Sequence, residues 1–387
     1  MKVEKKDYLW IIFFLIVFIN GFEAGGYQAS LLDIGKTYDL TTSTKGIFAS
    51  VELFATMLAP LILGAWADRN DKLKCIKLLL FIQIIAAFLV LFFSSKVVFA
   101  GGVFFLGLTT SALQFITIAA LADIYSFSCK KKIGFLTSMY ALGAFVAPLI
   151  VSAYLNMGFS WRTLFMLIAL TSILALIGLL SSKNEPTEQN ILSFDTAKLS
   201  GAFLLFPIIL LCIIMCIYVG YENGFAFFID TMFAEELHSS IGKYALSIFW
   251  IVMIPSRILV GYLGRYSRRI LICAIIAIPI LTIGVSQLNS DIQVLLLCIP
   301  LGFACGAIYP SVLNITMPFA GAHKATATGM ITTATGIGGV VFTALVGFMG
   351  EQYGLRTAMI ILSSFFIISL ICALGIVLSK NSVSQKN

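Results

Sequence analysis

Apolar runs separated by short polar segments repeat along the whole chain. Each run has about 20 residues or more, and an α-helix of that length, rising about 1.5 Å per residue, crosses roughly 30 Å of hydrocarbon. The pattern therefore predicts an all-α integral membrane protein with twelve transmembrane helices. We expect these spans at residues 9–32, 46–67, 75–94, 97–122, 133–156, 162–181, 201–231, 241–263, 270–288, 293–319, 326–350 and 357–379.

The composition agrees with this class of protein and excludes several others. Of the 387 residues, 60% are hydrophobic and 11% are charged, a balance outside that of soluble globular domains. The first span is too long for a signal-peptide core and lacks a small-residue cleavage site, so we expect it to be retained. The cysteines show no metal-ligand spacing, and no nucleotide-binding glycine-rich loop or nucleophile arrangement occurs. We therefore expect no metal, no cofactor and no enzymatic activity.

Lysine and arginine residues are concentrated on one side of the expected topology. The two termini and the even-numbered connections hold 18 of the 25, and such residues accumulate on the cytoplasmic side of a membrane. Both termini are therefore expected in the cytoplasm, with the chain in the inner membrane of a bacterial cell. The net charge of +7 follows from this asymmetry and from anionic lipid headgroups, so no nucleic-acid partner is expected.

The longest polar connection divides the twelve spans into two sets of six, the arrangement of a transporter built from two parallel repeats. A short repeated motif supports the division. After the second span of each half, a glycine lies four positions before a charged residue, at Gly64 and Asp68 in the first half and at Gly261 and Arg265 in the second. The expected parts are a first six-helix bundle at residues 1–182, a cytoplasmic linker at 183–200 and a second six-helix bundle at 201–387.

The stretch 64–74, GAWADRNDKLK, resembles the cytoplasmic loop motif of the major facilitator superfamily, whose usual form is G-x-L-a-D-R-x-G-R-K. It departs from that form at Trp66, where leucine is usual, and at Asp71, where the second glycine is usual. Twelve spans, two halves and cytoplasmic termini extend the resemblance over the whole chain. It implies two bundles that rock around a central site for a small-molecule substrate.

The charges of this loop have a physical role that we expect to be gating. Asp68 can accept hydrogen bonds from the free amides that open a neighbouring helix, which the family arrangement places at span eleven. Asp123, at the inner end of span four, is a partner for Arg69 or Lys72. The alternative is a loop whose charges only set the topology. The expected cytoplasmic latch comprises Gly64, Asp68, Arg69, Lys72, Asp123, Arg257 and Arg265.

Ionisable residues inside membrane spans are costly and usually functional. Glu23, among glycines in the first span, lies about 21 Å from the cytoplasmic end, and Glu52 in the second span lies at a similar depth. If the two acids are neighbours, one is protonated when the other is charged. We expect Glu23, Glu52 and Glu222 to couple transport to protons, and the alternative is a set of structural acids.

On the expected span boundaries, Glu222 and Arg257 lie at depths in the membrane that differ by about 10 Å. A direct pair then requires helices that are offset from one another. We therefore expect Arg257 to be a latch or helix-end partner in the second half, the counterpart of the first-half loop charges.

Polar and aromatic residues near the midplane are expected to bind substrate, because amides and ring faces suit a hydroxyl-rich ligand. The alternative is hydrogen bonding between helices. These residues are Asn20, Gln28, Gln114, Asn223, Trp250 and Tyr309. The segments 218–223, 256–261 and 302–310 resemble the fucose, galactose and glucose proton symporters of the superfamily. That branch tends to have an acid where this chain has Gln114, so any coupling would rest on the glutamates.

The function expected from these features is secondary active transport by alternating access, with protons and a sugar or similar small polar solute as partners. A proton-driven efflux protein for drugs or metabolites is the first alternative. The second is a membrane sensor that does not transport, or a facilitative uniporter. We expect a monomer embedded in the lipid bilayer.

Overall fold

The computed structural model describes residues 9–124, 129–181, 204–320 and 324–384, and the described residues are helical throughout, with no strand. The helices of the first half are α1 Leu9–Tyr38, α2 Thr42–Arg69, α3 Lys72–Phe92, α4 Lys96–Ile124, α5 Cys129–Asn156 and α6 Thr163–Ser181. Those of the second half are α7 Leu205–Glu236, α8 Gly242–Tyr262, the short 3₁₀ helix η1 Gly264–Tyr266, α9 Ser267–Gln287, α10 Asp291–Ala320, α11 Lys324–Tyr353, α12 Leu355–Ser364 and α13 Phe366–Ser384.

Within the described residues, twelve helical stretches are long and apolar enough to cross a membrane, which confirms the predicted fold class. Several expected spans were shorter than the helices; in particular, α1 and α7 continue to Tyr38 and Glu236, beyond the last apolar residues that marked the runs. The twelfth stretch, Leu355–Ile376, comprises α12 and part of α13, which meet at Phe365. The expected linker 183–200 lies outside the described residues.

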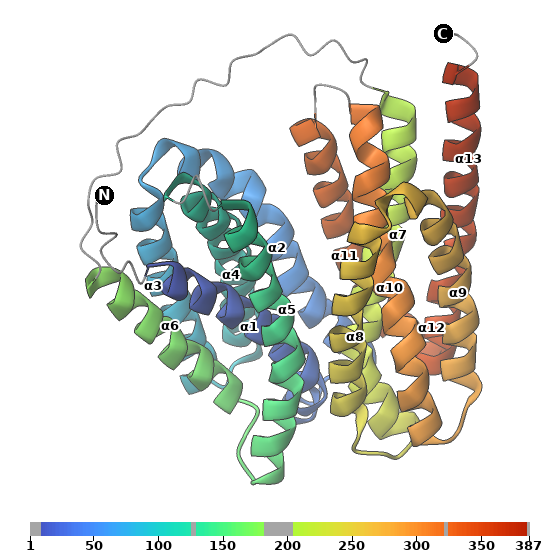
Figure 1. Ribbon diagram of the computed structural model, residues 1–387. Coiled ribbons are helices and arrows are strands. Elements are labelled where there is room, and N and C mark those ends of the chain that lie inside the picture. The colour runs from blue at the N-terminus through green and yellow to red at the C-terminus, as the bar shows by residue number, and fades with distance from the viewer. Residues whose placement is uncertain (1–8, 125–128, 182–203, 321–323, 385–387) are drawn as a thin grey trace. The chain divides into compact units, whose positions relative to one another are not determined.

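The chain forms two compact units. The first unit comprises Met1–Tyr38 with Val51–Ile191 (Figure 1). In it, α1 packs most extensively against α5, and α3 packs against α4 and α6.

The second unit comprises Asp39–Ser50 with Leu192–Asn387, so it includes the first two turns of α2. In this unit α7 packs most extensively against α11, and α10 packs against α8 and α9. The start of α2 is held by a hydrogen bond from the Ser50 hydroxyl to the Val340 carbonyl at 2.9 Å. It also crosses α11 closely, since Gly46 and Gly347 face each other with no side chain between them.

Glycines bring the same pairs of helices together in both units. A Cβ atom built on Gly21 of α1 would lie 1.9 Å from the Tyr140 carbonyl oxygen of α5. A Cβ atom on Gly338 of α11 would lie 1.9 Å from the Cys216 carbonyl oxygen of α7. These two contacts join helices that occupy corresponding places in the two halves of the chain. The packing therefore follows an internal repeat, which the order of the elements alone does not establish.

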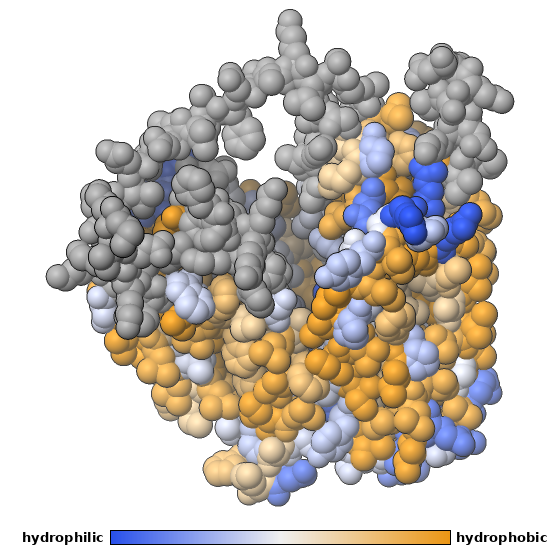
Figure 2. Space-filling view, viewed as in Figure 1, coloured by the Kyte–Doolittle hydropathy of each residue, from blue (hydrophilic) through white to orange (hydrophobic). Residues whose placement is uncertain are grey.

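The outward faces of the helices are apolar. Leu61, Leu174 and Ile280 are 62%, 63% and 63% exposed, and they belong to a long series of exposed large hydrophobic residues on the spans. On the face drawn in Figure 2, hydrophobic residues dominate the middle of the helices. Such surfaces are stable against lipid and not against water, so the burial pattern agrees with a membrane-embedded chain.

Candidate functional site

Glu23 is a buried acid of α1 that accepts a hydrogen bond from α4. Its side chain is 1% exposed, and the Thr110 hydroxyl lies 3.4 Å from its Oε2 atom as a donor. Asn20 lies one helical turn before Glu23 on the same face of α1, and its Nδ2 donates to the Thr110 carbonyl oxygen at 3.0 Å. Thr110 therefore contacts α1 through both its backbone and its side chain.

The hydrogen-bond network continues from Thr110 to two more helices. Gln83 of α3 donates from Nε2 to the Thr110 hydroxyl at 3.3 Å, and Ser172 of α6 lies 3.1 Å from the Gln83 Oε1 atom. Gln83 and Ser172 are both fully buried. Because a threonine hydroxyl has one hydrogen and here accepts from Gln83, that hydrogen is available for Glu23. The sequence analysis missed this network, although an amide in the otherwise apolar third span was a signal for it.

Glu52 of α2 lies beside Glu23, so the structure brings these two predicted acids together. Glu52 is 4% exposed and interacts electrostatically with Glu23, and Tyr27 neighbours both. The helices meet closely here, because a Cβ atom on Gly107 of α4 would lie 2.6 Å from the Glu52 carbonyl oxygen. Among the residues that the structure describes, neither acid has a cation within ion-pair distance. Two buried carboxylates without a cation repel when both are ionised, so this arrangement can hold a proton.

Glu222 of α7 forms an ion pair with Arg257 of α8, whose Nη2 atom lies 3.5 Å from the Glu222 Oε1 atom. The depth difference of about 10 Å that the sequence analysis derived is wrong, because α7 extends to Glu236. Glu222 lies 14 residues before the end of α7 and Arg257 lies 15 residues after the start of α8 at Gly242. Both are therefore about 21 to 22 Å along their helices from the α7–α8 turn.

The environment of this ion pair contains tyrosines. Tyr218 is fully buried and lies one turn before Glu222 on α7, and it interacts electrostatically with both members of the pair. Tyr309 of α10 is also an electrostatic neighbour of Arg257 and is 36% exposed. Tyr218 also lies within hydrogen-bond reach of both Glu222 and Arg257, so the phenol, the acid and the arginine form one polar cluster.

The same pentapeptide pattern carries both buried acids. Residues 21–25 read Gly-Phe-Glu-Ala-Gly around Glu23, and residues 220–224 read Gly-Tyr-Glu-Asn-Gly around Glu222. The flanking glycines face neighbouring helices at short distances in both units. The two acids thus occupy equivalent positions of the internal repeat, although one lies beside an acid and the other beside an arginine.

The other expected substrate residues lie in varied surroundings. Gln28 is buried, Gln114 is half-buried on α4, and Trp250 is half-buried with its ring 6.0 Å from that of Phe249. Asn223 donates from Nδ2 to the Val219 carbonyl oxygen of its own helix at 3.0 Å. This local bond uses one of the two amide hydrogens of Asn223.

The predicted latch is described only in part, because the side chains of Asp68 and Asp123 lie outside the described residues. Arg69 is exposed at the end of α2 and Lys72 begins α3. Among the described residues, nothing beyond the neighbouring part of α2 lies within 4 Å of a Cβ built on Gly64. The Arg265 guanidinium lies over the ring of Tyr266, 4.6 Å from its centroid. Asp71, where the superfamily motif has glycine, caps α3 by accepting a hydrogen bond from the Lys74 amide at 3.0 Å.

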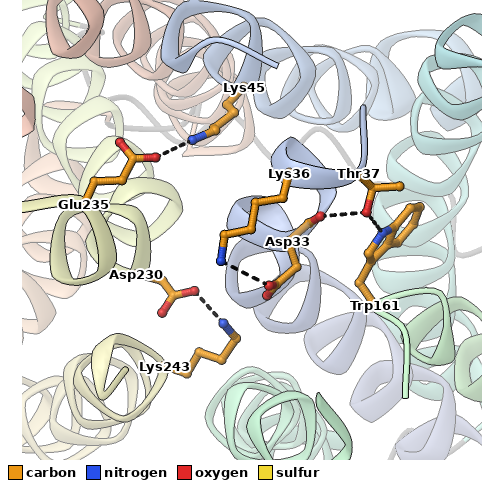
Figure 3. Close-up of polar contacts among 8 residues, drawn as sticks. All are labelled: Asp33, Lys36, Thr37, Lys45, Trp161, Asp230, Glu235 and Lys243. Carbon is orange, nitrogen blue, oxygen red and sulfur yellow. Dashed lines mark hydrogen bonds and ion pairs between the residues drawn. The ribbon is translucent and has the colours of Figure 1, made fainter. Parts of the chain in front are cut away.

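The sequence analysis did not anticipate the ion pairs of the second unit near the α7–α8 turn, two of which are drawn in Figure 3. Asp230 of α7 and Lys243 of α8 are buried and lie 2.6 Å apart. Lys45, in the first turns of α2, is 4% exposed and lies 2.8 Å from Glu235 of α7. The signal for the first pair was present, because Asp230 falls inside the expected seventh span and was not counted there. Both pairs lie near the α7–α8 turn, at one end of this unit.

No group of three or more histidine, cysteine, aspartate or glutamate side chains in the described residues is placed to hold a metal ion. Two of the buried acidic sites that the structure describes lie well inside the spans, Glu23–Glu52 in one unit and Glu222–Arg257 in the other.

Comparisons with known proteins agree with the fold. The family model described as Major Facilitator Superfamily matches residues 13–324 and 210–387. The glucose/mannose transporter GlcP of Bacillus subtilis is 23% identical over 358 residues, covering 88% of this chain and 86% of its own. The TsgA homologue of Buchnera aphidicola is 20% identical over 341 residues, covering 87% and 84%.

Solved structures also match over nearly the whole chain. A bacterial homologue of the human lysosomal transporter Spinster superposes with a TM-score of 0.81 at 15% identity, covering 95% of this chain and 96% of that one. The nucleoside transporter NupG superposes with a TM-score of 0.74 at 14% identity, covering 95% and 98%. At this level of identity the likeness concerns the fold alone.

Proposed function

The chain belongs to the Major Facilitator Superfamily and is a multi-pass membrane transporter, and we propose that it couples proton movement to the uptake of a sugar or similar small polar solute. The family and the bacterial relatives place it in an inner membrane. The proposal has three parts, which are the coupling to protons, the class of the solute and the direction of transport.

The adjacent buried acids Glu23 and Glu52 carry the proposal of proton coupling. A proton-coupled transporter needs a group that binds a proton in one state and releases it in another. A pair of carboxylates can bind and release a proton at a low free-energy cost, because the first proton removes the repulsion between the two charges. Thr110 supplies a hydrogen bond that stabilises Glu23 when it is ionised, so both protonation states have a partner. Glu222 is assigned a lesser role in coupling, since Arg257 already neutralises it.

The solute class rests on two kinds of support. The relative GlcP is named as a glucose/mannose transporter and matches 88% of this chain. The expected binding residues Asn20, Gln28, Gln114, Asn223, Trp250 and Tyr309 provide amides, an indole and a phenol, which suit ring hydroxyls and sugar faces. We propose import, with cytoplasmic termini and a latch around residues 64–74 that opens as the two bundles rock.

The decisive experiment measures external pH in a weakly buffered suspension of de-energised cells that express the protein. Glucose, mannose, amino acids, organic acids and amphipathic cations are added one at a time. We expect alkalinisation with a neutral sugar, and we expect Glu23→Gln to abolish it while Glu4→Gln, outside the spans, leaves it unchanged.

Other outcomes lead to other functions. Acidification with amphipathic cations would indicate proton-driven efflux. Sugar uptake that is unaffected in Glu23→Gln and Glu52→Gln would indicate a uniporter. Absence of any solute movement in cells that contain the folded protein would indicate a sensor.

A further inference from the structure

We propose that the α8–α9 turn of the second unit, residues 262–269, binds the phosphate of an anionic phospholipid whose acyl chain lies against α9. This surface is separate from the buried acids on which the proposed coupling rests. Basic residues are attracted to anionic membranes in general, and the proposal goes further, because it assigns one discrete position on the chain to one class of headgroup.

Charge is distributed unevenly along the second unit. Residues 237–290 contain no aspartate or glutamate. Apart from Glu222 inside its span, the acids that the structure describes in this unit lie near the α7–α8 turn or on the same side of the unit; they are Asp39, Asp230, Glu235, Glu236, Asp291 and Glu351. The α8–α9 turn, at the other end of α8, has Arg265, Arg268 and Arg269. Within the described residues, none of these three arginines forms an ion pair with an acid.

Arg269 lies at the start of the lipid-facing side of α9. At alternating spacings of four and three residues it is followed, on the same helix face, by Cys273, Ile276, Ile280 and Ile283. The cysteine is exposed, and the three isoleucines are 45%, 63% and 47% exposed. An exposed apolar face of a membrane helix contacts lipid tails, so Arg269, which is exposed in the first turn, lies where this face meets the headgroups.

An apolar groove lies beside Arg268, between α9, α10 and α13. Besides this half-buried arginine, its lining consists of Leu271, Ile272, Ile315, Ala373 and Ile376. A phospholipid has the same two parts, an acyl chain and a charged phosphate joined through glycerol. Basic pockets between membrane helices suit such headgroups, and the apolar lining suits the chain.

Two tyrosines mark the turn as a membrane-surface segment. Tyr262 and Tyr266 are 86% and 38% exposed, and tyrosine is enriched where a bilayer meets water. The Arg265 guanidinium lies 4.6 Å from the centroid of the Tyr266 ring, a cation–π contact that orients it at this surface. Figure 2 shows strongly hydrophilic residues gathered at this end of the unit, beyond the hydrophobic middle of the helices.

The chemistry of the turn selects an anionic lipid. Guanidinium groups bind phosphate oxygens through paired hydrogen bonds. A choline headgroup adds an ammonium charge, which the three arginines repel, whereas a glycerol headgroup leaves the phosphate charge uncompensated. A free phosphate has no acyl chain for the groove or for the isoleucines of α9, so a lipid is favoured over a soluble anion.

The competing occupant is the linker at residues 183–200. It holds Glu185, Glu188 and Asp195, and it precedes α7, whose first residue lies at this end of the unit. Its three acids match the three arginines in charge. The phospholipid is favoured because a polar segment over Arg269 would also cover the exposed isoleucines of α9, at a cost in desolvated polar groups.

The experiment titrates phosphatidylglycerol into mixed micelles that contain the purified full-length chain. It records the unfolding temperature at one scan rate, and native mass spectrometry counts the lipids that stay bound. The comparison ligands are phosphatidylcholine with the same acyl chains, inorganic phosphate and glycerol 1-phosphate. We expect phosphatidylglycerol to raise the unfolding temperature and to remain bound at one molecule per chain, because a ligand that binds only the folded state stabilises it. We expect none of the comparison ligands to do either.

The variants locate the effect on the turn. Arg268→Gln/Arg269→Gln should raise the mole fraction of phosphatidylglycerol needed for half the stabilisation about 25-fold, since each arginine close to an anionic headgroup changes affinity about fivefold. The matched control is Lys36→Gln/Lys96→Gln, which removes two exposed cations from helix ends of the first unit and should change that value less than twofold. Glu185→Gln/Glu188→Gln/Asp195→Asn, which neutralises the linker, should behave as the wild type.

Four results would overturn the inference. Equal stabilisation by phosphatidylcholine would remove the selection for an anion, and an equal loss in the lysine control would show a general surface attraction. Displacement of the lipid by inorganic phosphate or glycerol 1-phosphate would indicate a site for a soluble anion. Several-fold stronger lipid binding after neutralising the linker would identify the linker as the occupant. Because no solute or proton gradient is present, each result is independent of the proposed function.

Discussion

Replacing Gly21 by alanine tests how tightly α1 and α5 must pack to position Glu23. The added Cβ atom would lie 1.9 Å from the Tyr140 carbonyl oxygen, whereas ordinary contacts begin at 3.4 Å. The two helices must therefore separate by about 1.5 Å, the difference between these distances, because a backbone carbonyl cannot rotate away as a side chain can. Overpacking of this size costs about 1–3 kcal/mol.

The assay is thermal unfolding of the purified protein in detergent, followed by tryptophan fluorescence at one fixed scan rate. With about 2–4 °C lost per kcal/mol in a unit of this size, we expect Gly21→Ala to unfold roughly 2–12 °C below the wild type. The control is Gly101→Ala on α4, where nothing in the described residues beyond the neighbouring part of α4 lies within 4 Å of the new Cβ. Alanine is the better helix former by roughly 0.5–1 kcal/mol, so this variant should unfold at or slightly above the wild-type temperature.

Gly338→Ala extends the test to the second unit, because its Cβ would also lie 1.9 Å from a backbone carbonyl oxygen. The repeat therefore predicts a destabilisation similar to that of Gly21→Ala. If Gly21→Ala and Gly101→Ala unfold within a degree of each other, the α1–α5 crossing is not the constraint described here.

Three further variants test other contacts. Neutralising either Asp230 or Lys243 alone should lower the stability measured by thermal unfolding by about 3–5 kcal/mol. The double neutral variant should recover most of that loss, and an additive loss would show that the two residues are not coupled. Gln83→Leu should reduce solute-driven alkalinisation without reducing sugar binding, because the leucine cannot donate a hydrogen bond to the Thr110 hydroxyl. Unchanged proton uptake would exclude a role for the Gln83–Thr110 hydrogen bond in coupling. Asp71→Ala should lower stability by about 0.5–2 kcal/mol and Asp71→Ser should not, and equal stabilities would argue against the helix cap.

The sequence was sufficient to predict the twelve spans because each span is long, apolar and bounded by polar segments. The ends of the helices were less predictable, since a helix that leaves the membrane continues through polar residues that the hydrophobic pattern does not count. That limit had a consequence at the α7–α8 turn. With α7 ending near residue 231 in place of Glu236, Glu222 and Arg257 were placed at different depths, and their ion pair was not predicted.

The sequence predicted those site residues that are rare in membrane spans, and it did not predict those that are common there. Glutamates in apolar spans are conspicuous, and comparable depths suggested that Glu23 and Glu52 are neighbours. Gln83 and Ser172 were not singled out, because buried amides and hydroxyls in membranes usually serve as interhelical contacts. Their connection to Thr110 depends on how three helices are rotated about their axes, and the order of residues does not determine those rotations.

The two units use one repeated element for different chemistry. Glu23 and Glu222 occupy the same place in a Gly-x-Glu-x-Gly segment of the first helix of each half. What differs is the residue that the second helix of each half brings to that acid, since α2 supplies the carboxylate of Glu52 and α8 supplies the guanidinium of Arg257. An acid beside an acid gains stability by taking up a proton, whereas an acid beside an arginine is already neutralised and keeps its oxygens as hydrogen-bond acceptors. On this reasoning the repeat places in the first unit an acid that can take up a proton, and in the second unit an acid whose charge is already compensated.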